Sequence, residues 1–417
     1  MLNTSARLPK KVLHVLNSSA GGAALSTLGL IGAFREHGIE SCAVCHAAGS
    51  PAERERLRDA VRGEVLFTPL YWWTKKVRKP LWKRPLSEMR QLVSTGWGRR
   101  SSAFVTKFAV DHDVDLIHSN TLTTPEGGIA AERLKLPHVW HIRELVGPGT
   151  THPLRLSGPA LGRYLEAHCS KLVANSHATA ELVRHLVAAD ILEIVPNGIE
   201  LSRFRFRLRD QPKQPIVVGM VASMTAHWKK HALFVEAAAQ VDRSLPIEWR
   251  IYGLDPSQGG TVRGDAYVDA LHDRLAARGI ADRFTWPGYV PEPVEVMDQI
   301  DVLVHPANGE SFGRIVVEGM AAGIPVVGVA GGGVGEIIID GRSGLLSPVD
   351  DAAGLAANIE KVVRDPALRA ALGQSGREHA QCCYSLEACA SRMLEVYQKA
   401  MARPVGLPAD ADRPVSL

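Results

Sequence analysis

The stretch HPANGESFGRIVVEGMAAGIPVVGVAGGGVGEIIIDGRSGLL, residues 305–346, decides the fold. It completes the apolar run DVLVHP, which is typical of a buried strand in a parallel sheet. Asn308 and Gly309 then supply a turn, and RIVVEGMAAGI carries apolar residues at helical spacing. Pro325 opens the next short apolar run, PVVGV. Strand, helix and strand in this order predict part of an open α/β sheet with parallel strands.

Two carboxylates flank the start of the predicted helix. Glu310 falls just outside the carboxyl end of a strand, where open α/β sheets bind ligands, and Glu318 follows about two turns later. Between them, the backbone N–H groups of Ser311, Phe312 and Gly313 fall at the helix entrance, which suits an anion or a hydroxyl. A nucleotide sugar, with phosphate in the middle and hydroxyls at both ends, fits this pattern. Two glutamates taken alone could equally be a helix-terminal charge and a solvated helix residue.

The wider pattern resembles the donor-site signature of retaining glycosyltransferases of the GT-B fold, and it is most similar to glycosyltransferase family 4. The signature is a glutamate, seven residues and a second glutamate, with FG after the first and GMAAGIPVV after the second. The continuation GGGVGEIIIDGRSGLL also resembles a segment of that family. The resemblance covers residues 12–400. It implies that Glu310 contacts the transferred sugar and that Glu318 contacts the ribose hydroxyls.

The composition is that of a globular enzyme. The chain has 417 residues, of which 46% are hydrophobic and 22% are charged, and its length predicts two or three domains. A net charge of +4 gives no overall electrostatic footprint for nucleic-acid binding. No apolar run reaches the ~18 residues of a transmembrane helix, and MLNTSARLPKK is a poor signal peptide. We expect a cytoplasmic protein with reduced cysteines, located in solution or at the inner face of the membrane.

A haem-attachment pattern occurs in an unsuitable place. Cys42, Cys45 and His46 match the C-x-x-C-H pattern of c-type haem attachment. They fall in ESCAVCHAAG, which we interpret as the second strand of the sheet, so we expect no haem there. The three cysteines near the C-terminus have no partners at zinc-ligand spacing. We predict no metal site, and no cofactor other than the nucleotide sugar that serves as donor substrate.

The N-terminal half opens with a glycine loop. KVLHVLN, residues 11–17, leads through SSAGGAA into a predicted helix, an arrangement that can bind anions. A glycine loop alone is as often structural as functional. Gly21 and Gly22 resemble the GGAE loop of the family, and the resemblance implies donor binding. Ala24 stands where the family carries its glutamate.

Two further predicted strands, 113–120 and 136–145, end in polar residues. These residues are His118, Ser119, Asn120, His141, Arg143 and Glu144. A strand-end histidine is more often a hydrogen-bonded structural residue than a catalyst. The WHIRE run nevertheless resembles the family segment that carries a histidine at the acceptor side. The resemblance implies a catalytic positioning role for His141 and places His118, Asn120, Arg143 and Glu144 on the acceptor side.

A pair of lysines follows the first predicted strand of the C-terminal half, in MTAHWKKH. Lys229 resembles the lysine that grips the donor diphosphate in the family, and point cations suit a pyrophosphate when no metal is present. Two positions depart from the family. Ser223 stands where an arginine is usual, and Lys230 replaces a glycine and could supply the missing charge. A solvated turn is the alternative for such a lysine pair.

The segment YWWTKKVRKPLWKR, residues 71–84, carries three tryptophans among six basic residues and no acid. Tryptophan at an interface with lysine and arginine near anionic headgroups is how peripheral proteins hold a bilayer. The segment therefore predicts contact with the inner membrane or with an anionic lipid-linked acceptor. A solvated surface loop is the equal alternative.

The predicted fold is α/β, of the GT-B type, with two doubly wound Rossmann-like domains facing across a cleft. Residues 1–204 form the acceptor-side domain, and residues 205–380 form the nucleotide-sugar-binding domain. Residues 381–417 form a helix that crosses back to the first domain, followed by a disordered tail. The polar segment FRLRDQPKQP, residues 206–215, is the predicted interdomain linker.

The implied activity is that of a metal-independent, retaining transferase of the hexosyltransferase type, with Glu310, His141 and Lys229 as catalytic residues. It would move a sugar from a nucleotide sugar to a carbohydrate or lipid-linked acceptor in surface polysaccharide or lipopolysaccharide biosynthesis. Double displacement needs a carboxylate behind the anomeric carbon, and Glu144 is the only further candidate in the recognised segments. We therefore favour a same-face mechanism, in which the leaving diphosphate takes the acceptor proton.

Other functions remain open on this fold. One is a non-catalytic protein that binds a nucleotide sugar or the cell envelope, which the departures at Ala24 and Ser223 make conceivable. Others are a nucleotide-sugar epimerase, a phosphorylase, and a sugar-phosphate synthase with a soluble phosphorylated acceptor. The intact Glu310, Glu318 and Lys229 argue for activity.

Overall fold

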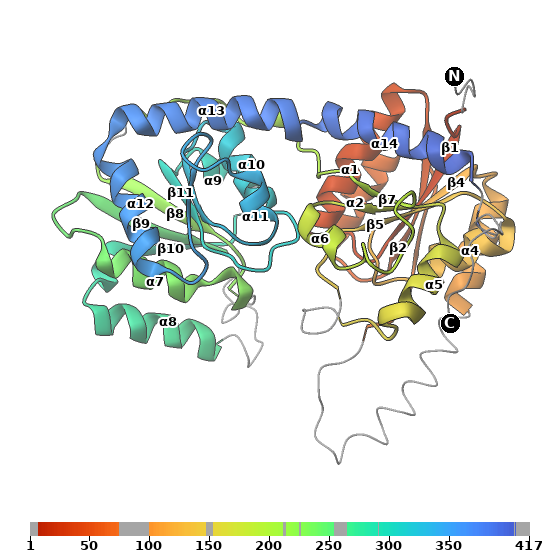
Figure 1. Cartoon of the computed structure of the whole chain (residues 1–417), viewed down its shortest axis with the longest axis horizontal. Coiled ribbons are helices and arrows are strands. Elements are labelled where there is room, and N and C mark those ends of the chain that lie inside the picture. Colours follow the sequence, from red (N-terminus) through yellow and green to blue (C-terminus); the bar gives the residue numbers. More distant parts are fainter. Residues whose placement is uncertain are drawn as a thin grey trace, which may run out of the picture. The chain divides into compact units, whose positions relative to one another are not determined.

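The chain folds into two compact units in the computed structural model (Figure 1). The structure describes residues 7–74, 100–146, 153–211, 214–224, 227–253, 265–290, 292–403 and 405. The first unit comprises Met1–Gly198 and Leu386–Leu417, and the second comprises Ile199–Ser385.

The first unit is built on a seven-stranded parallel sheet in the order β3-β2-β1-β4-β5-β6-β7. Its strands are β1 (Lys11–Leu16), β2 (Glu40–His46), β3 (Val65–Thr68), β4 (Leu116–Ser119), β5 (His138–Ile142), β6 (Lys171–Ala174) and β7 (Leu192–Ile194). Its helices are α1 (Gly21–Glu36), α2 (Pro51–Val61), α4 (Glu126–Leu134), α5 (Gly158–His168), α6 (His177–Glu181) and α14 (Leu386–Met401). The strand order reverses between β1 and β4, which makes this the topological switch point of the sheet.

Helices α1 and α14 lie side by side over one face of the first sheet (Figure 1). Helix α14 turns Cys389, Met393 and Tyr397 toward the strands, at the four-residue spacing of one helix face. The rings of Tyr397 and Phe34, from α1, lie 5.0 Å apart between centroids. Helix α14 therefore packs in the same hydrophobic core as β1 and α1, although it lies far from them in the sequence.

The second unit has a six-stranded parallel sheet in the order β10-β9-β8-β11-β12-β13. Its strands are β8 (Ile216–Val221), β9 (Ile247–Tyr252), β10 (Phe284–Gly288), β11 (Val302–His305), β12 (Val326–Val329) and β13 (Leu345–Ser347). Its α-helices are α7 (His231–Gln240), α8 (Asp265–Arg278), α9 (Pro293–Met297), α10 (Arg314–Ala321), α11 (Gly332–Ile337), α12 (Ala352–Arg364) and α13 (Pro366–Tyr384). Here the order reverses between β8 and β11, so the loops after these two strands meet at the switch point.

Two doubly wound units with parallel sheets confirm the predicted fold class. The strands at the centre of each sheet are mostly apolar and almost completely buried, as in LHVL and VLVH, because helices cover both faces of a doubly wound sheet. The chain passes from the first unit to the second after Gly198 and returns to the first unit after Ser385. The domain boundaries predicted from the sequence were residues 204 and 380. The first difference arises because Ile199, Leu201 and Phe204 are buried in the core of the second unit.

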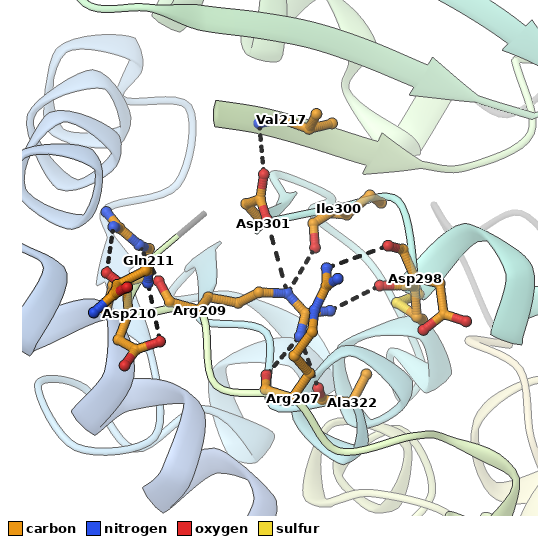
Figure 2. A network of polar contacts seen from close by, with 11 residues as sticks. Arg207, Arg209, Asp210, Gln211, Val217, Asp298, Ile300, Asp301 and Ala322 are labelled. Carbon is orange, nitrogen blue, oxygen red and sulfur yellow. Dashed lines mark hydrogen bonds and ion pairs between the residues drawn. The ribbon is translucent and has the colours of Figure 1, made fainter. Parts of the chain in front are cut away.

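The prediction of a linker at residues 206–215 is wrong for the described residues 206–211, because Arg209 docks them on the second unit (Figure 2). Its buried guanidinium donates to the carbonyl oxygens of Ile300 (3.1 Å) and Met297 (3.0 Å) and lies 3.9 Å from the Asp301 carboxylate. Burial lowers the pKa of Arg209 to about 10, which leaves it charged at neutral pH. Arg369, from α13, in turn donates to the carbonyl oxygen of Arg209.

Some predictions fall outside the described residues. These are the glycine-rich loop at 255–266 except for its last two residues, residues 75–84 of the basic aromatic segment, and nearly all of the C-terminal tail. Within the described ranges, no helix combines the length and the apolar character needed to cross a bilayer.

We predict that Arg209→Met lowers the free energy of unfolding of the second unit by about 2–4 kcal/mol, because several buried carbonyl oxygens lose their donor and Asp301 loses a nearby charge. Arg205→Met is the matched control, since Arg205 is exposed and should change stability by less than about 0.5 kcal/mol. Denaturant unfolding followed by tryptophan fluorescence measures both. Equal losses in the two variants would contradict the docking role of Arg209.

Candidate functional site

The switch point of the second sheet brings Lys229 and Glu310 together. Lys229 ends a 3-10 turn, His227–Lys229, after β8, and Glu310 lies in the loop after β11. The Lys229 ammonium forms an ion pair with Oε1 of Glu310, across 81 residues of sequence. The two loops are also joined by their backbones, since Asn308 N–H donates to the carbonyl oxygen of Trp228 at 3.2 Å. Two residues that the sequence predicted in separate motifs thus share one site.

His305 is a third member of this site, and the sequence analysis did not single it out. It is the last residue of β11 and is fully buried, and its Nε2 lies 3.4 Å from the same Oε1 of Glu310. The signal that could have found it was its position, since it ends a central strand at the switch point and directly precedes the Glu310 loop.

The charges of the site act on one another. Burial raises the pKa of Glu310, but the Lys229 charge and His305 outweigh it and hold this pKa at about 2. Burial lowers the pKa of His305, and Glu310 partly offsets this effect. The Glu310 carboxylate is therefore ionised at neutral pH, mostly shielded from water, and paired with one ammonium.

A glycine turn presses against the Glu310 loop. Gly333 N–H donates to the carbonyl oxygen of Glu310 at 2.9 Å. A Cβ on Gly332 would lie 2.6 Å from that oxygen, and one on Gly333 would lie 2.5 Å from Cα of Phe312. These distances are too short for any side chain, so the GGG sequence serves the close packing that shapes the loop.

The predicted backbone donors precede a short helix. Gly313, with φ of +105°, is the N-cap of α10, which begins at Arg314. Ser311 and Phe312 stand before this cap, so the N–H groups of the first helical turn begin at Arg314 and not, as predicted, at Ser311. The Phe312 side chain is buried against Tyr384, at 5.7 Å between ring centroids, which anchors the loop to α13.

Glu318 and Lys230 lie near the site but have other partners. Glu318 is almost fully buried on α10, where its Oε1 accepts from Nε of Arg314 at 2.7 Å. Burial raises the pKa of Glu318, although Arg314 acts in the opposite direction. Lys230 forms an ion pair with Asp350 at 2.8 Å. The structure thus brings neither of them into the Lys229–Glu310 pair.

In the first unit, the glycine loop lies at the corresponding switch point. Gly21, with φ of +83°, and Gly22 are exposed at the start of α1. Asn120, just after β4, accepts a hydrogen bond from the Thr27 hydroxyl of α1 at 2.7 Å. Ala24, at the position of the family glutamate, is buried. The glycine loop after β1 and Asn120 after β4 are therefore linked by α1, which begins at the loop and contacts Asn120.

Three buried histidines form a column across the centre of the first sheet. His14, His118 and His141 come from β1, β4 and β5, and neighbouring ring centroids are 5.5 Å apart. Nδ1 of His118 lies 2.8 Å from the Tyr397 hydroxyl of α14. Burial lowers the pKa of all three, so they are neutral at neutral pH. His141 is fully buried, and in this conformation it has no surface to offer a ligand.

Arg143 and Glu144 tie the strand ends together. Glu144 accepts from the backbone N–H groups of Leu122 at 2.7 Å and Arg143 at 3.0 Å, one on each carboxylate oxygen. The Arg143 guanidinium donates to the side-chain oxygen of Asn197. Burial raises the pKa of Glu144 to about 7. Both oxygens of Glu144 are thus occupied by backbone donors of its own unit.

The haem-like pattern is divided between the two faces of a strand. Cys42 packs in the core cluster with Leu13 and Val15, whereas Cys45 packs with Leu16 and Ile31 on the opposite face. Burial raises the pKa of both thiols to about 12. Two cysteines on opposite faces cannot attach one haem. Across the described ranges, no three His, Cys, Asp or Glu side chains are arranged to hold a metal ion.

One part of the predicted membrane segment is a core element. Trp73 is buried, its indole N–H donates to the carbonyl oxygen of Leu122, and its ring stacks on Trp140 at 5.8 Å. The prediction that Trp73 meets a membrane or an acceptor is therefore wrong. Trp72 is 41% exposed.

Comparisons with known proteins agree with this architecture. The model described as Glycosyltransferase Family 4 matches residues 20–203, and the model described as Glycosyl transferases group 1 matches residues 203–379. The D-inositol 3-phosphate glycosyltransferase of Streptomyces avermitilis is 31% identical over 69% of this chain and 66% of its own. That of Arthrobacter sp. (strain FB24) is 31% identical over 69% of this chain and 71% of its own. The chain thus spans about two thirds of the length of the curated relatives it matches.

Solved structures resemble nearly the whole chain. Anabaena Alr3699/HepE, in complex with UDP and glucose, has a TM-score of 0.72 and 21% identity over 93% of this chain and 99% of its own. The lipopolysaccharide outer core galactosyltransferase WaaB has a TM-score of 0.65 and 13% identity over 93% and 99%. These likenesses confirm the predicted GT-B fold.

The buried histidines make the first unit sensitive to acid. Their pKa is lowered by folding, for His14 to about 3 and for His138 to about 4, so the unfolded state binds more protons below about pH 6.5. Above that pH, burial of the neutral histidines does not reduce the free energy of unfolding. As the pH falls below it, the free energy of unfolding decreases by up to about 1.4 kcal/mol per pH unit for each histidine. Glu144, with its raised pKa, acts in the opposite direction between about pH 7 and 4.5.

We therefore predict that the free energy of unfolding falls between pH 6.5 and 4, and that His14→Leu makes this fall less steep. Denaturant unfolding at a series of pH values measures the slope. His37→Leu is the control, because His37 is exposed at the end of α1 and should change this slope much less than His14→Leu does. Identical slopes for wild type and His14→Leu would contradict the prediction.

Proposed function

This chain belongs to glycosyltransferase family 4, and we propose that it transfers a sugar from a nucleotide-sugar donor to an acceptor hydroxyl with retention of configuration. The observation that carries the proposal is the Lys229–Glu310 ion pair at the switch point of the second sheet, beside the entrance of α10. An ammonium and a carboxylate beside the start of a helix match a ligand that carries both phosphate and hydroxyls.

A bound nucleotide sugar would give both Lys229 and Glu310 a new partner in place of each other. The donor diphosphate offers Lys229 more negative charge than one carboxylate does, and the N–H groups that enter α10 add donors to phosphate oxygens. Glu310 would then accept hydrogen bonds from sugar hydroxyls. By resemblance to the family, Glu318 contacts the ribose, and Gly21 and Gly22 of the first unit also contact the donor.

The proposed chemistry is a same-face displacement. The bond between the anomeric carbon and the diphosphate oxygen breaks, the acceptor oxygen bonds to that carbon on the same face, and its proton passes to the leaving diphosphate. Lys229 stabilises the charge of the leaving group, which makes metal independence part of the proposal. Double displacement through Glu144 is disfavoured, because both of its oxygens accept backbone hydrogen bonds. His141, fully buried, would act by positioning the strand ends.

Two acceptor classes are proposed, each from its own observation. Relatives 31% identical to this chain are named D-inositol 3-phosphate glycosyltransferase, which favours a soluble phosphorylated polyol. The basic segment that follows Trp73 favours an anionic lipid-linked or polysaccharide acceptor at the inner face of the membrane. With either acceptor class, the proposed location is the cytoplasm.

The test is release of nucleoside diphosphate from UDP-, GDP- and ADP-sugars with a chelator present. Inositol phosphate or a lipid extract serves as acceptor. We expect release from one donor class, and a fall in kcat/KM on the order of 10²–10³-fold in Glu310→Gln and in Lys229→Met. Lys230→Met is the matched control, because Lys230 pairs with Asp350 and should lose less than about tenfold.

The outcomes separate the alternatives. Binding of a nucleotide sugar without release from any donor would favour a non-catalytic binding protein. Loss of release on chelation would overturn metal independence. A covalent glycosyl adduct on Glu144 would overturn the same-face displacement. The acceptor that stimulates release names the acceptor class.

A further inference from the structure

We propose that His305 holds the Glu310 carboxylate in place while Lys229 moves from Glu310 to the donor diphosphate. His305 is thus a positioning residue. It stays beside Glu310 while Lys229 exchanges Glu310 for the diphosphate of the ligand. This inference rests on the proposed function, since it assigns Lys229 to the diphosphate. It adds a residue and a sequence of events to the same site.

The geometry makes one partner of Glu310 fixed and the other movable. Lys229 and His305 both approach Oε1 of Glu310. His305 belongs to β11, a central strand that pairs with β8 on one side and β12 on the other, and its side chain is fully buried. Lys229 extends from a three-residue 3-10 turn, and 22% of its side chain is exposed. Only the lysine can reach a ligand without disturbing the sheet.

The distance between His305 and Glu310 is consistent with a hydrogen bond that forms only after Lys229 has left. The distance of 3.4 Å from Nε2 to Oε1 is longer than the 2.7–3.2 Å of an ordinary N–H···O hydrogen bond. With Lys229 on the same oxygen, the imidazole need not come closer. When the lysine leaves, a neutral imidazole with its proton on Nε2 can donate to Oε1 at normal length.

The chemistry explains why a histidine occupies this buried position. Within the described part of the chain, neither ring nitrogen of His305 has a hydrogen-bond partner, and its nearest polar contact is the 3.4 Å approach of Nε2 to Oε1 of Glu310. A buried polar ring without a hydrogen bond costs stability compared with an apolar side chain. A carboxylate that lost Lys229 without another donor would cost more, because it would be a buried, unpaired charge.

The proposal makes a specific statement about nucleoside diphosphates that carry no sugar. Such a ligand takes Lys229 but offers Glu310 no hydroxyl, so Glu310 then depends on His305. Removing the imidazole should therefore weaken binding of the diphosphate, and it should do so only while residue 310 carries a charge.

A double-mutant cycle tests this statement. Calorimetry measures the Kd of UDP, GDP and ADP for wild type, His305→Leu, Glu310→Gln and the double variant. We expect His305→Leu to raise the Kd of the bound diphosphate on the order of tenfold in the wild-type background and by less than twofold in the Glu310→Gln background. His305→Gln should stay close to wild type, because its amide N–H₂ can replace Nε2–H as a donor.

His379→Leu is the control, since His379 is a partly buried histidine on α13 that makes an edge-to-face contact with Tyr384. It should leave the Kd unchanged. An equal loss from His305→Leu in both backgrounds would assign His305 a purely structural role and overturn the inference, as would no loss in the wild-type background. Absence of sugar transfer with the expected cycle intact would overturn only the proposed function. Failure of wild type to bind any of the three diphosphates would overturn both.

Discussion

The partly buried ion pair between Lys229 and Glu310 joins the two loops at the switch point of the second unit. A mostly buried carboxylate is stable only with a cation beside it, so the loops after β8 and β11 must end within reach of each other. The strand order provides this, because β8 and β11 are neighbours although a long stretch of chain separates them. The same pairing leaves a positive and a negative side chain next to each other, and a ligand with phosphate and hydroxyl groups can bind to both.

The rest of the second unit limits how that loop can move. Gly332 and Gly333 approach the backbone of Glu310 and Phe312 so closely that no side chain fits between them. Phe312 is held by Tyr384 of α13, and Arg209 fastens the entering chain to the carbonyl oxygens around Ile300. A loop fixed on several sides presents its carboxylate in one orientation, which is a requirement for precise contact with a sugar.

The first unit uses its polar strand ends differently. His118 and His141 are stacked inside the core, and Glu144 and Arg143 hydrogen-bond to neighbouring strand ends. These groups determine the conformation of the segments after β4 and β5 without offering a surface themselves. Among the described residues of the loop after β1, Gly21 and Gly22 are exposed, and Asn17 and Ser18 are partly exposed. Specificity for an acceptor would then reside in loop shape, for which the core histidines provide the support.

Local sequence was sufficient for the fold class and for part of the site. Apolar runs and glycine turns repeat along the chain, and short-range rules connect them to parallel strands and helices, so α/β units with parallel sheets followed from the pattern. The resemblance to the family added the division into two doubly wound domains. The Glu310 motif was found because it is a compact run of residues, and Lys229 was found because its short segment resembles the family. Tertiary structure decided what depends on distant contacts: the pairing of Lys229 with Glu310, the role of His305, the burial of Trp73 and His141, and the docking of the supposed linker through Arg209. These features depend on which side chains from remote segments lose water together, and that is settled only when the chain is packed.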